Sequence, residues 1–157
     1  MGLIDEFFDL GAATFKTPRM SKEGDSAFKP GSMRPLKTDW PTIIIEAGWC
    51  ESITKLREDA RRWLENSRGA IKIVLLISIG RRARMMIIEK WENGPQIATQ
   101  IQAITIDTNS NTVIGAPLTL EFRKIFLRQA VPPLEHDFTI TAQHLSAYAT
   151  NFWAGMQ

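Results

Sequence analysis

The chain has 157 residues, 44% of them hydrophobic and 23% charged, so its composition is that of one globular domain with its own core. A formal net charge of only +2 excludes a protein that attracts nucleic acid over its whole surface, so any basic patch must be local. The single cysteine excludes an internal disulfide, and no apolar run reaches membrane-spanning length. We therefore expect one domain over residues 1–157, inside the cell in cytoplasm or nucleus, with no membrane partner.

The N-terminal part of the chain predicts a helix followed by two strands. Four apolar residues lie at helical spacing near the start: Leu3, Ile4, Phe7 and Phe8. They predict a short amphipathic helix that ends near Gly11. The segment 13–20 is typical of a weak strand. The segment 23–31, EGDSAFKPG, predicts another strand, on which Asp25 and Lys29 share one face because side chains alternate along a strand.

The middle of the chain predicts a strand, a helix and a second strand. The segment 40–48, WPTIIIEAG, is rich in β-branched residues and indicates a strand covered on both faces. The segment 51–69 predicts a helix, with an apolar stripe that includes Leu56 and Trp63. The segment 70–80 predicts a buried strand. A crossover of this kind joins parallel strands, so the two strands should run in the same direction.

The C-terminal half predicts further strands and a last helix. A strand over 85–92 follows the basic turn at 80–84, and the segment 101–115 indicates a hairpin that turns at Asn109–Asn111. Alternate residues then predict one face of a strand: Leu118, Leu120 and Phe122. Thr141 is a predicted N-cap for the final helix. The predicted class is α/β or α+β with a mixed β-sheet.

Two carboxylates form the candidate site. Glu46 ends a run of isoleucines, and a carboxylate on a buried strand is costly unless it is paired. If the strands carrying Asp25 and Glu46 are neighbours, the two acids converge and suit Mg²⁺, which could activate water. In the alternative interpretation Glu46 pairs with Arg57 or Arg61 of the following helix, and Asp25 belongs to a turn.

Several segments together resemble a group of uncharacterised fungal proteins that is similar to the restriction-endonuclease-like, PD-(D/E)XK nuclease superfamily. They are EGDSAFKP (23–30), WPTIIIEAGWCESITKLREDARRWLENS (40–67), IKIVLLISI (71–79), MMIIEKWE (85–92) and GAPLTLEFRKIFLR (115–128). The resemblance implies a restriction-endonuclease-like core of αβββαβ order, followed here by a C-terminal β-hairpin and helix. It implies that Asp25 and Glu46 bind Mg²⁺ or Mn²⁺ and drive phosphodiester hydrolysis in nucleic acid.

The chain departs from the pattern of that superfamily in two places. Gly24 replaces the proline before the aspartate, and Gly48 stands where a catalytic lysine is usual. Lys55, on the following helix, is the expected substitute for this lysine, and Lys72 is a second option. If neither reaches the acids, the resemblance implies a nuclease fold without nuclease activity that binds nucleic acid or protein.

Two surfaces suggest partners. Arg81, Arg82 and Arg84 form the densest basic cluster and are the expected nucleic-acid-binding residues. The alternative interpretation of this cluster is a solvated turn. A homodimer is a further expectation, because Phe7 and Phe8 would give a short N-terminal helix an apolar surface.

The remaining reactive and aromatic residues receive mostly structural roles. His136 and His144 lack the spacing of metal ligands and are expected at the surface or in packing. Cys50 is expected to be buried. Trp63 is expected in the core, whereas Trp49 is the tryptophan expected to line a site.

Overall fold

The computed structural model describes residues 7–11, 14–17, 20–23 and 26–156, with side chains from Ser26 onward. The described chain is an α+β fold built on a seven-stranded mixed sheet of order β1-β4-β5-β6-β7-β8-β9. Its strands are β1 (Phe7–Gly11), β4 (Ser26–Pro30), β5 (Ile43–Trp49), β6 (Ile73–Gly80), β7 (Met85–Asn93), β8 (Ala98–Asp107) and β9 (Thr112–Ile114). Two small hairpins, β2–β3 (Thr14–Thr17, Met20–Glu23) and β10–β11 (Leu118–Leu120, Phe138–Ile140), accompany it.

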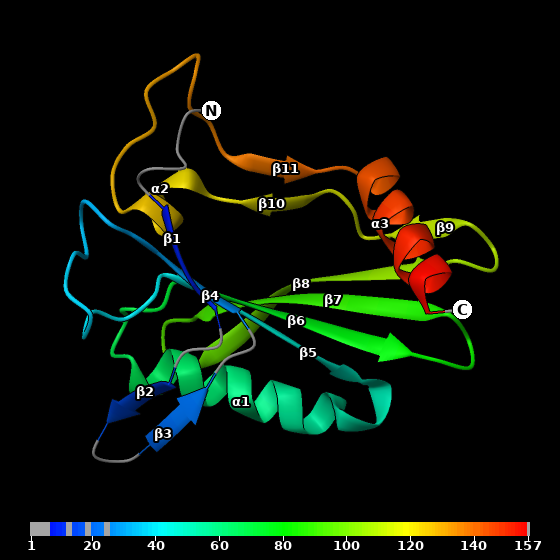
Figure 1. Cartoon of the computed structure of the whole chain (residues 1–157), viewed down its shortest axis with the longest axis horizontal. Helices are drawn as coiled ribbons and strands as arrows, with labels where there is room; N and C mark the ends of the chain where they lie inside the picture. Colours follow the sequence, from blue (N-terminus) through cyan, green and yellow to red (C-terminus); the bar gives the residue numbers. More distant parts are fainter. Residues whose placement is uncertain (1–6, 12–13, 18–19, 24–25, 157) are drawn as a thin grey trace.

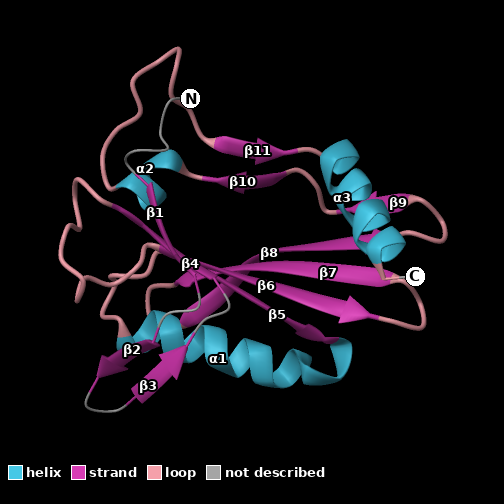
Figure 2. Ribbon diagram, in the orientation of Figure 1, coloured by secondary structure: helices cyan, strands magenta, loops and turns pink. Residues whose placement is uncertain are grey.

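The helices cover both faces of this sheet. Helix α1 (Ile53–Asn66), entered through the one-turn helix η2 (Cys50–Ser52), lies on one face, as Figure 1 shows. Helices α2 (Phe122–Phe126) and α3 (Ala142–Gly155) lie on the other side with the β10–β11 hairpin (Figure 2). Each face has its own apolar core, because strand side chains alternate between the two faces.

The predicted crossover is confirmed. Strands β5 and β6 are parallel, with Glu46 opposite Leu76, and α1 connects them. The stripe predicted for the helix is buried, with Leu56, Ala60 and Trp63 all in the core on this face. The hairpin predicted around Asn109–Asn111 is also confirmed as β8–β9.

The prediction of an N-terminal helix is wrong where the structure describes it. Phe7–Gly11 form strand β1, which pairs antiparallel with β4. The order αβββαβ therefore fails at its first element, since the described N-terminal segments are strands. Aromatic residues favour strands, and pairing with a sheet outweighs a short helical pattern. The spacing of apolar residues reports only local structure, so it cannot show that this segment pairs with β4, which comes later in the chain.

The predicted strand face at Leu118, Leu120 and Phe122 is correct only for its first two members. β10 ends at Leu120, and Phe122 begins helix α2. Its backbone N–H donates to Asp137 Oδ1 at 2.8 Å, so a distant carboxylate supplies an acceptor at the start of the helix. For α3 the local signal suffices, because Thr141 accepts the backbone N–H of His144 as predicted.

No helix in the described residues is both long and apolar enough to cross a membrane.

Gly115, in the turn that leads into β10, can be compared with Gly69, which follows α1, to measure how much a side chain at Gly115 would destabilise the fold. Both have positive φ, 93° and 82°, but a Cβ on Gly115 would lie 2.4 Å from the Ala103 carbonyl oxygen, whereas Gly69 has open space. We expect Gly69→Ala to cost about 1–2 kcal/mol of unfolding free energy, from backbone strain alone. Gly115→Ala should cost about 3 kcal/mol or more, because the clash is with backbone. Equal costs in urea unfolding would contradict this.

Candidate functional site

Glu46 lies on the face of β5 that packs against α1 and is 4% exposed. One of its oxygens, Oε1, accepts the indole N–H of Trp63 at 2.9 Å, and Trp63 is fully buried. The prediction that Trp63 is a core residue is confirmed. The alternative pairing of Glu46 with Arg57 or Arg61 is not found: Arg57 bonds Glu89, and Arg61 lies over the ring of Trp91.

Glu89 is a second buried carboxylate that sequence reasoning missed. It is 1% exposed and lies in the same row across the sheet as Glu46, separated by Leu76 of β6. Its oxygens accept hydrogen bonds from the Arg57 guanidinium at 2.5 and 3.0 Å and from the Trp91 indole N–H at 2.9 Å. The hydrogen bond to Glu89 raises the pKa of Arg57. Both carboxylates are therefore acceptors inside the helix–sheet core.

Gly48, at the position of the missing lysine, lies under α1. A Cβ placed there would lie 3.3 Å from Cδ1 of Leu56. The helix thus presents an apolar side chain over this position, while its neighbour Lys55 is exposed. No carboxylate of the described residues lies within ion-pair distance of Lys55.

Lys72, the second option for the catalytic lysine, lies at the far end of the strands. Its backbone N–H bonds the carbonyl of Thr42, whereas Glu46 pairs with Leu76, four residues along. Four residues of strand span about 13 Å. This register separates Lys72 from Glu46.

Asp25 lies outside the described residues. The described pairing of β4 with β5 begins at Ser26, opposite Ile45. Among the described residues, no group of three or more His, Cys, Asp or Glu side chains that could hold a metal ion is found. The prediction that Asp25 and Glu46 hold Mg²⁺ or Mn²⁺ therefore stays a prediction.

The predicted basic cluster forms the turn between β6 and β7. Arg81, Arg82 and Arg84 are all exposed, and within the described part of the chain none of them pairs with a carboxylate. The Arg81 guanidinium lies 4.1 Å from the ring centre of Trp49, which is 38% exposed. These residues bring positive charge and an accessible aromatic ring together at one end of the sheet.

The turn that carries Arg81, Arg82 and Arg84, called the arginine turn below, is hydrogen-bonded to the β8–β9 turn. Asn109 Nδ2 donates to the Ala83 carbonyl at 2.9 Å, and the backbone N–H of Thr108 donates to the Arg84 carbonyl at 3.2 Å. The backbone that carries the arginines is thus fixed by a second turn, which lowers the cost of ordering it on a ligand. The sequence gives no signal for this contact, since the two turns are joined only by the sheet register.

The remaining residues of interest do not form a site. His136 and His144 are exposed, as expected for surface histidines. Cys50 is exposed, which corrects the expectation that it is buried. It follows β5 in the one-turn helix η2, whose residues are not buried.

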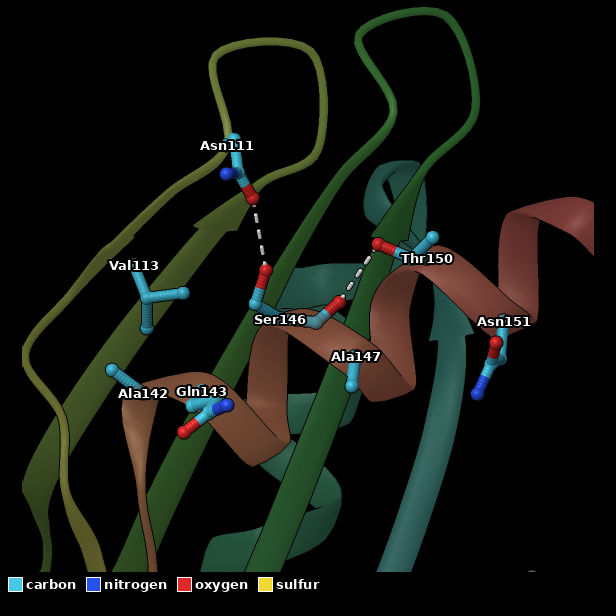
Figure 3. A pocket seen from close by; sticks show the side chains of 8 residues that line it. All are labelled: Asn111, Val113, Ala142, Gln143, Ser146, Ala147, Thr150 and Asn151. Atoms are coloured by element: carbon cyan, nitrogen blue, oxygen red, sulfur yellow. Dashed lines mark hydrogen bonds between the residues drawn. The ribbon is translucent and has the colours of Figure 1, made fainter.

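A pocket between β9 and α3 is lined by small and neutral polar side chains, as Figure 3 shows. Ser146 Oγ donates to Asn111 Oδ1 at 3.1 Å across it, and Thr150 Oγ1 donates to the Ser146 carbonyl at 3.0 Å. None of the described residues that line it is ionisable, so this pocket offers no acid, base or ion pair. They are Asn111, Val113, Ala142, Gln143, Ser146, Ala147, Thr150 and Asn151.

Comparisons with protein families, with curated proteins and with solved structures find no match to this chain.

A double-mutant cycle on Glu46 and Trp63 measures whether this carboxylate is structural. We expect the two substitutions Glu46→Ala and Trp63→Phe to couple by about 1.5–3 kcal/mol in urea unfolding, because they share a buried hydrogen bond to a charged group. Trp91→Phe is the matched control, since the Trp91 indole bonds Glu89 instead. Its coupling to Glu46→Ala should stay within about 0.5 kcal/mol. Additive effects of Glu46→Ala and Trp63→Phe would contradict a structural role.

Proposed function

We propose that this protein binds single-stranded nucleic acid through the arginine turn of Arg81, Arg82 and Arg84, without cutting it. The observation that carries this proposal is the stacking of Arg81 on the exposed Trp49, beside two further arginines that pair with no carboxylate of the described residues. Proteins that bind single strands combine backbone-contacting cations with aromatic rings on which bases stack. A local cluster of this kind is compatible with a net charge of only +2.

The environment of Glu46 favours binding without hydrolysis. A metal ligand in a nuclease needs an oxygen that water and substrate can approach, whereas Glu46 is 4% exposed and bonds an indole of the core. At Gly48, the place of the usual lysine, Leu56 occupies the adjacent space. These two contacts support the alternative that the resemblance implied, a nuclease-like fold used for binding.

A metal-dependent nuclease is the competing proposal. In it, the fold is the restriction-endonuclease-like core, Asp25 and Glu46 hold Mg²⁺ or Mn²⁺, and Lys55 assists catalysis. One observation favours it: Ile45, next to Glu46, pairs with Ser26, which follows Asp25 in the chain.

The expectations of a fungal origin, an intracellular location and a homodimer stay predictions.

Fluorescence anisotropy with a labelled single-stranded oligonucleotide tests the binding proposal. We expect the triple substitution of Arg81, Arg82 and Arg84 to alanine to weaken binding by about tenfold or more. The slope of log K against log salt should fall by about 2, since each phosphate contact of a single strand contributes about 0.7. Trp49→Ala should also weaken binding, at an unchanged salt slope, because it removes stacking and no charge.

The matched control removes three cations from another surface. Lys55, Arg61 and Arg62 are exposed on α1, and their triple substitution to alanine changes the net charge by the same amount. We expect this variant to bind nearly as the parent does. Equal losses in the two triple variants would show that only overall charge matters and would overturn the arginine turn as the binding site.

A cleavage assay separates the two proposals. We expect no cutting of plasmid or single-stranded substrate in Mg²⁺ or Mn²⁺. Cutting that disappears in both Asp25→Ala and Glu46→Ala, each checked for folding by circular dichroism, would establish the nuclease and overturn binding without hydrolysis. If Lys55→Ala also abolished cutting, Lys55 would be assigned as the catalytic lysine.

A further inference from the structure

The end of α3 and the arginine turn enclose a pocket that the proposed function does not use. Arg81, Arg84, Trp153 and Met156 line it. Figure 1 shows why these residues meet: α3 crosses above the sheet and ends close to the β6–β7 turn. Two cations and an indole are thus brought together from elements about seventy residues apart in the chain, by the ordinary packing of a helix on a sheet.

The indole N–H of Trp153 is a buried donor without an acceptor. Trp153 is 5% exposed, and its Nε1 has no hydrogen-bond partner in the described part of the chain. The other two deeply buried indoles, of Trp63 and Trp91, each donate to a carboxylate. Buried polar groups are nearly always paired in folded proteins, so an orphaned donor indicates a partner that is absent from the protein alone.

A second buried polar atom without a partner lies beside the same turn. Thr108 Oγ1 has none in the described residues, and the backbone N–H of Thr108 bonds the Arg84 carbonyl. Three buried side-chain atoms of the described residues have no hydrogen-bond partner, and two of them, on Thr108 and Trp153, belong to this end of the sheet; the third is Oε2 of Glu46.

The groups that line the pocket identify the chemistry of that ligand. The arginines and the indole can only donate hydrogen bonds, and none of the described lining residues is acidic. Two guanidiniums and a third donor match an anion with several oxygens, above all a phosphoryl group. The C-terminal end of α3 opposes an anion, but this effect is weaker than two charge-assisted hydrogen bonds.

We propose that Arg81, Arg84 and the Trp153 indole N–H bind one phosphoryl group. This inference rests on the proposed function for its source: the group is the terminal phosphate of a nucleic-acid strand whose following phosphates lie along the arginine turn. The N–H is buried in this structure, so a lining side chain must move for the phosphoryl group to reach it. We expect Met156 to be that side chain, because it lines the pocket, is 48% exposed and is flexible.

Binding of inorganic phosphate tests the pocket directly. In ¹H–¹⁵N spectra we expect the Trp153 indole signal to shift on titration with phosphate, while the indole of Trp63 stays in place. Trp153→Phe keeps an aromatic ring and removes the donor, and it should weaken phosphate binding about tenfold. Trp40→Phe, a tryptophan outside the pocket, should leave phosphate binding unchanged. An unmoved Trp153 indole at saturating phosphate would overturn the proposal.

Oligonucleotides with and without a 5′- or 3′-phosphate distinguish the source of the group. We expect one phosphorylated end to bind about tenfold more tightly than its unphosphorylated form, with this preference lost in Trp153→Phe. If that variant does not fold, Arg84→Ala and the indole signal of the parent protein decide. Phosphate binding through Trp153 without any oligonucleotide binding would support the pocket and overturn the proposed function. Oligonucleotide binding that ignores both the end phosphate and Trp153 would overturn the pocket alone.

Discussion

Helix α1 packs onto β5 and β6, and this packing decides which side chains of the central strands are buried. The crossover between parallel strands brings the apolar stripe of the helix onto the sheet, with Trp63 over Glu46 and Leu56 over Gly48. This explains why a run of isoleucines ends in a carboxylate and why a glycine follows two residues later. The carboxylate receives an indole donor, and the glycine leaves room for the leucine.

On both faces of the sheet, buried charged groups form hydrogen bonds with other groups of the chain. On the α1 face, Glu89 is satisfied by Arg57 and Trp91. On the opposite face, buried Lys90 donates to the Thr119 carbonyl and to Glu121 at 2.8 Å each. A buried charge is tolerated when hydrogen bonds replace the water that it loses. These carboxylates and this lysine are therefore parts of the scaffold, and their partners are supplied from within the chain.

The cations and the unpaired indole that could bind a ligand lie together at one edge of the fold. The carboxyl end of β5, the β6–β7 turn, the β8–β9 turn and the end of α3 meet at one edge of the fold (Figure 1). There the cations are exposed and unpaired within the described residues, and the indole of Trp153 lacks an acceptor among them. Inside the scaffold Glu89 has its own donors, whereas the arginine side chains and the Trp153 indole at this edge have none among the described residues that accept from them.

The elements whose signals are local could be predicted from the residues alone: the buried strands, the amphipathic α1, the β8–β9 turn and the Thr141 cap. It also identified the arginine turn, because charge clustering is visible in the chain. Three pairings became visible only in the folded chain: Phe7–Gly11 pair as a strand, Glu46 bonds Trp63, and Trp153 lines a pocket with Arg81 and Arg84. Strand register and helix packing set the partner of each side chain, and they join residues that are too far apart in the chain to leave a local pattern.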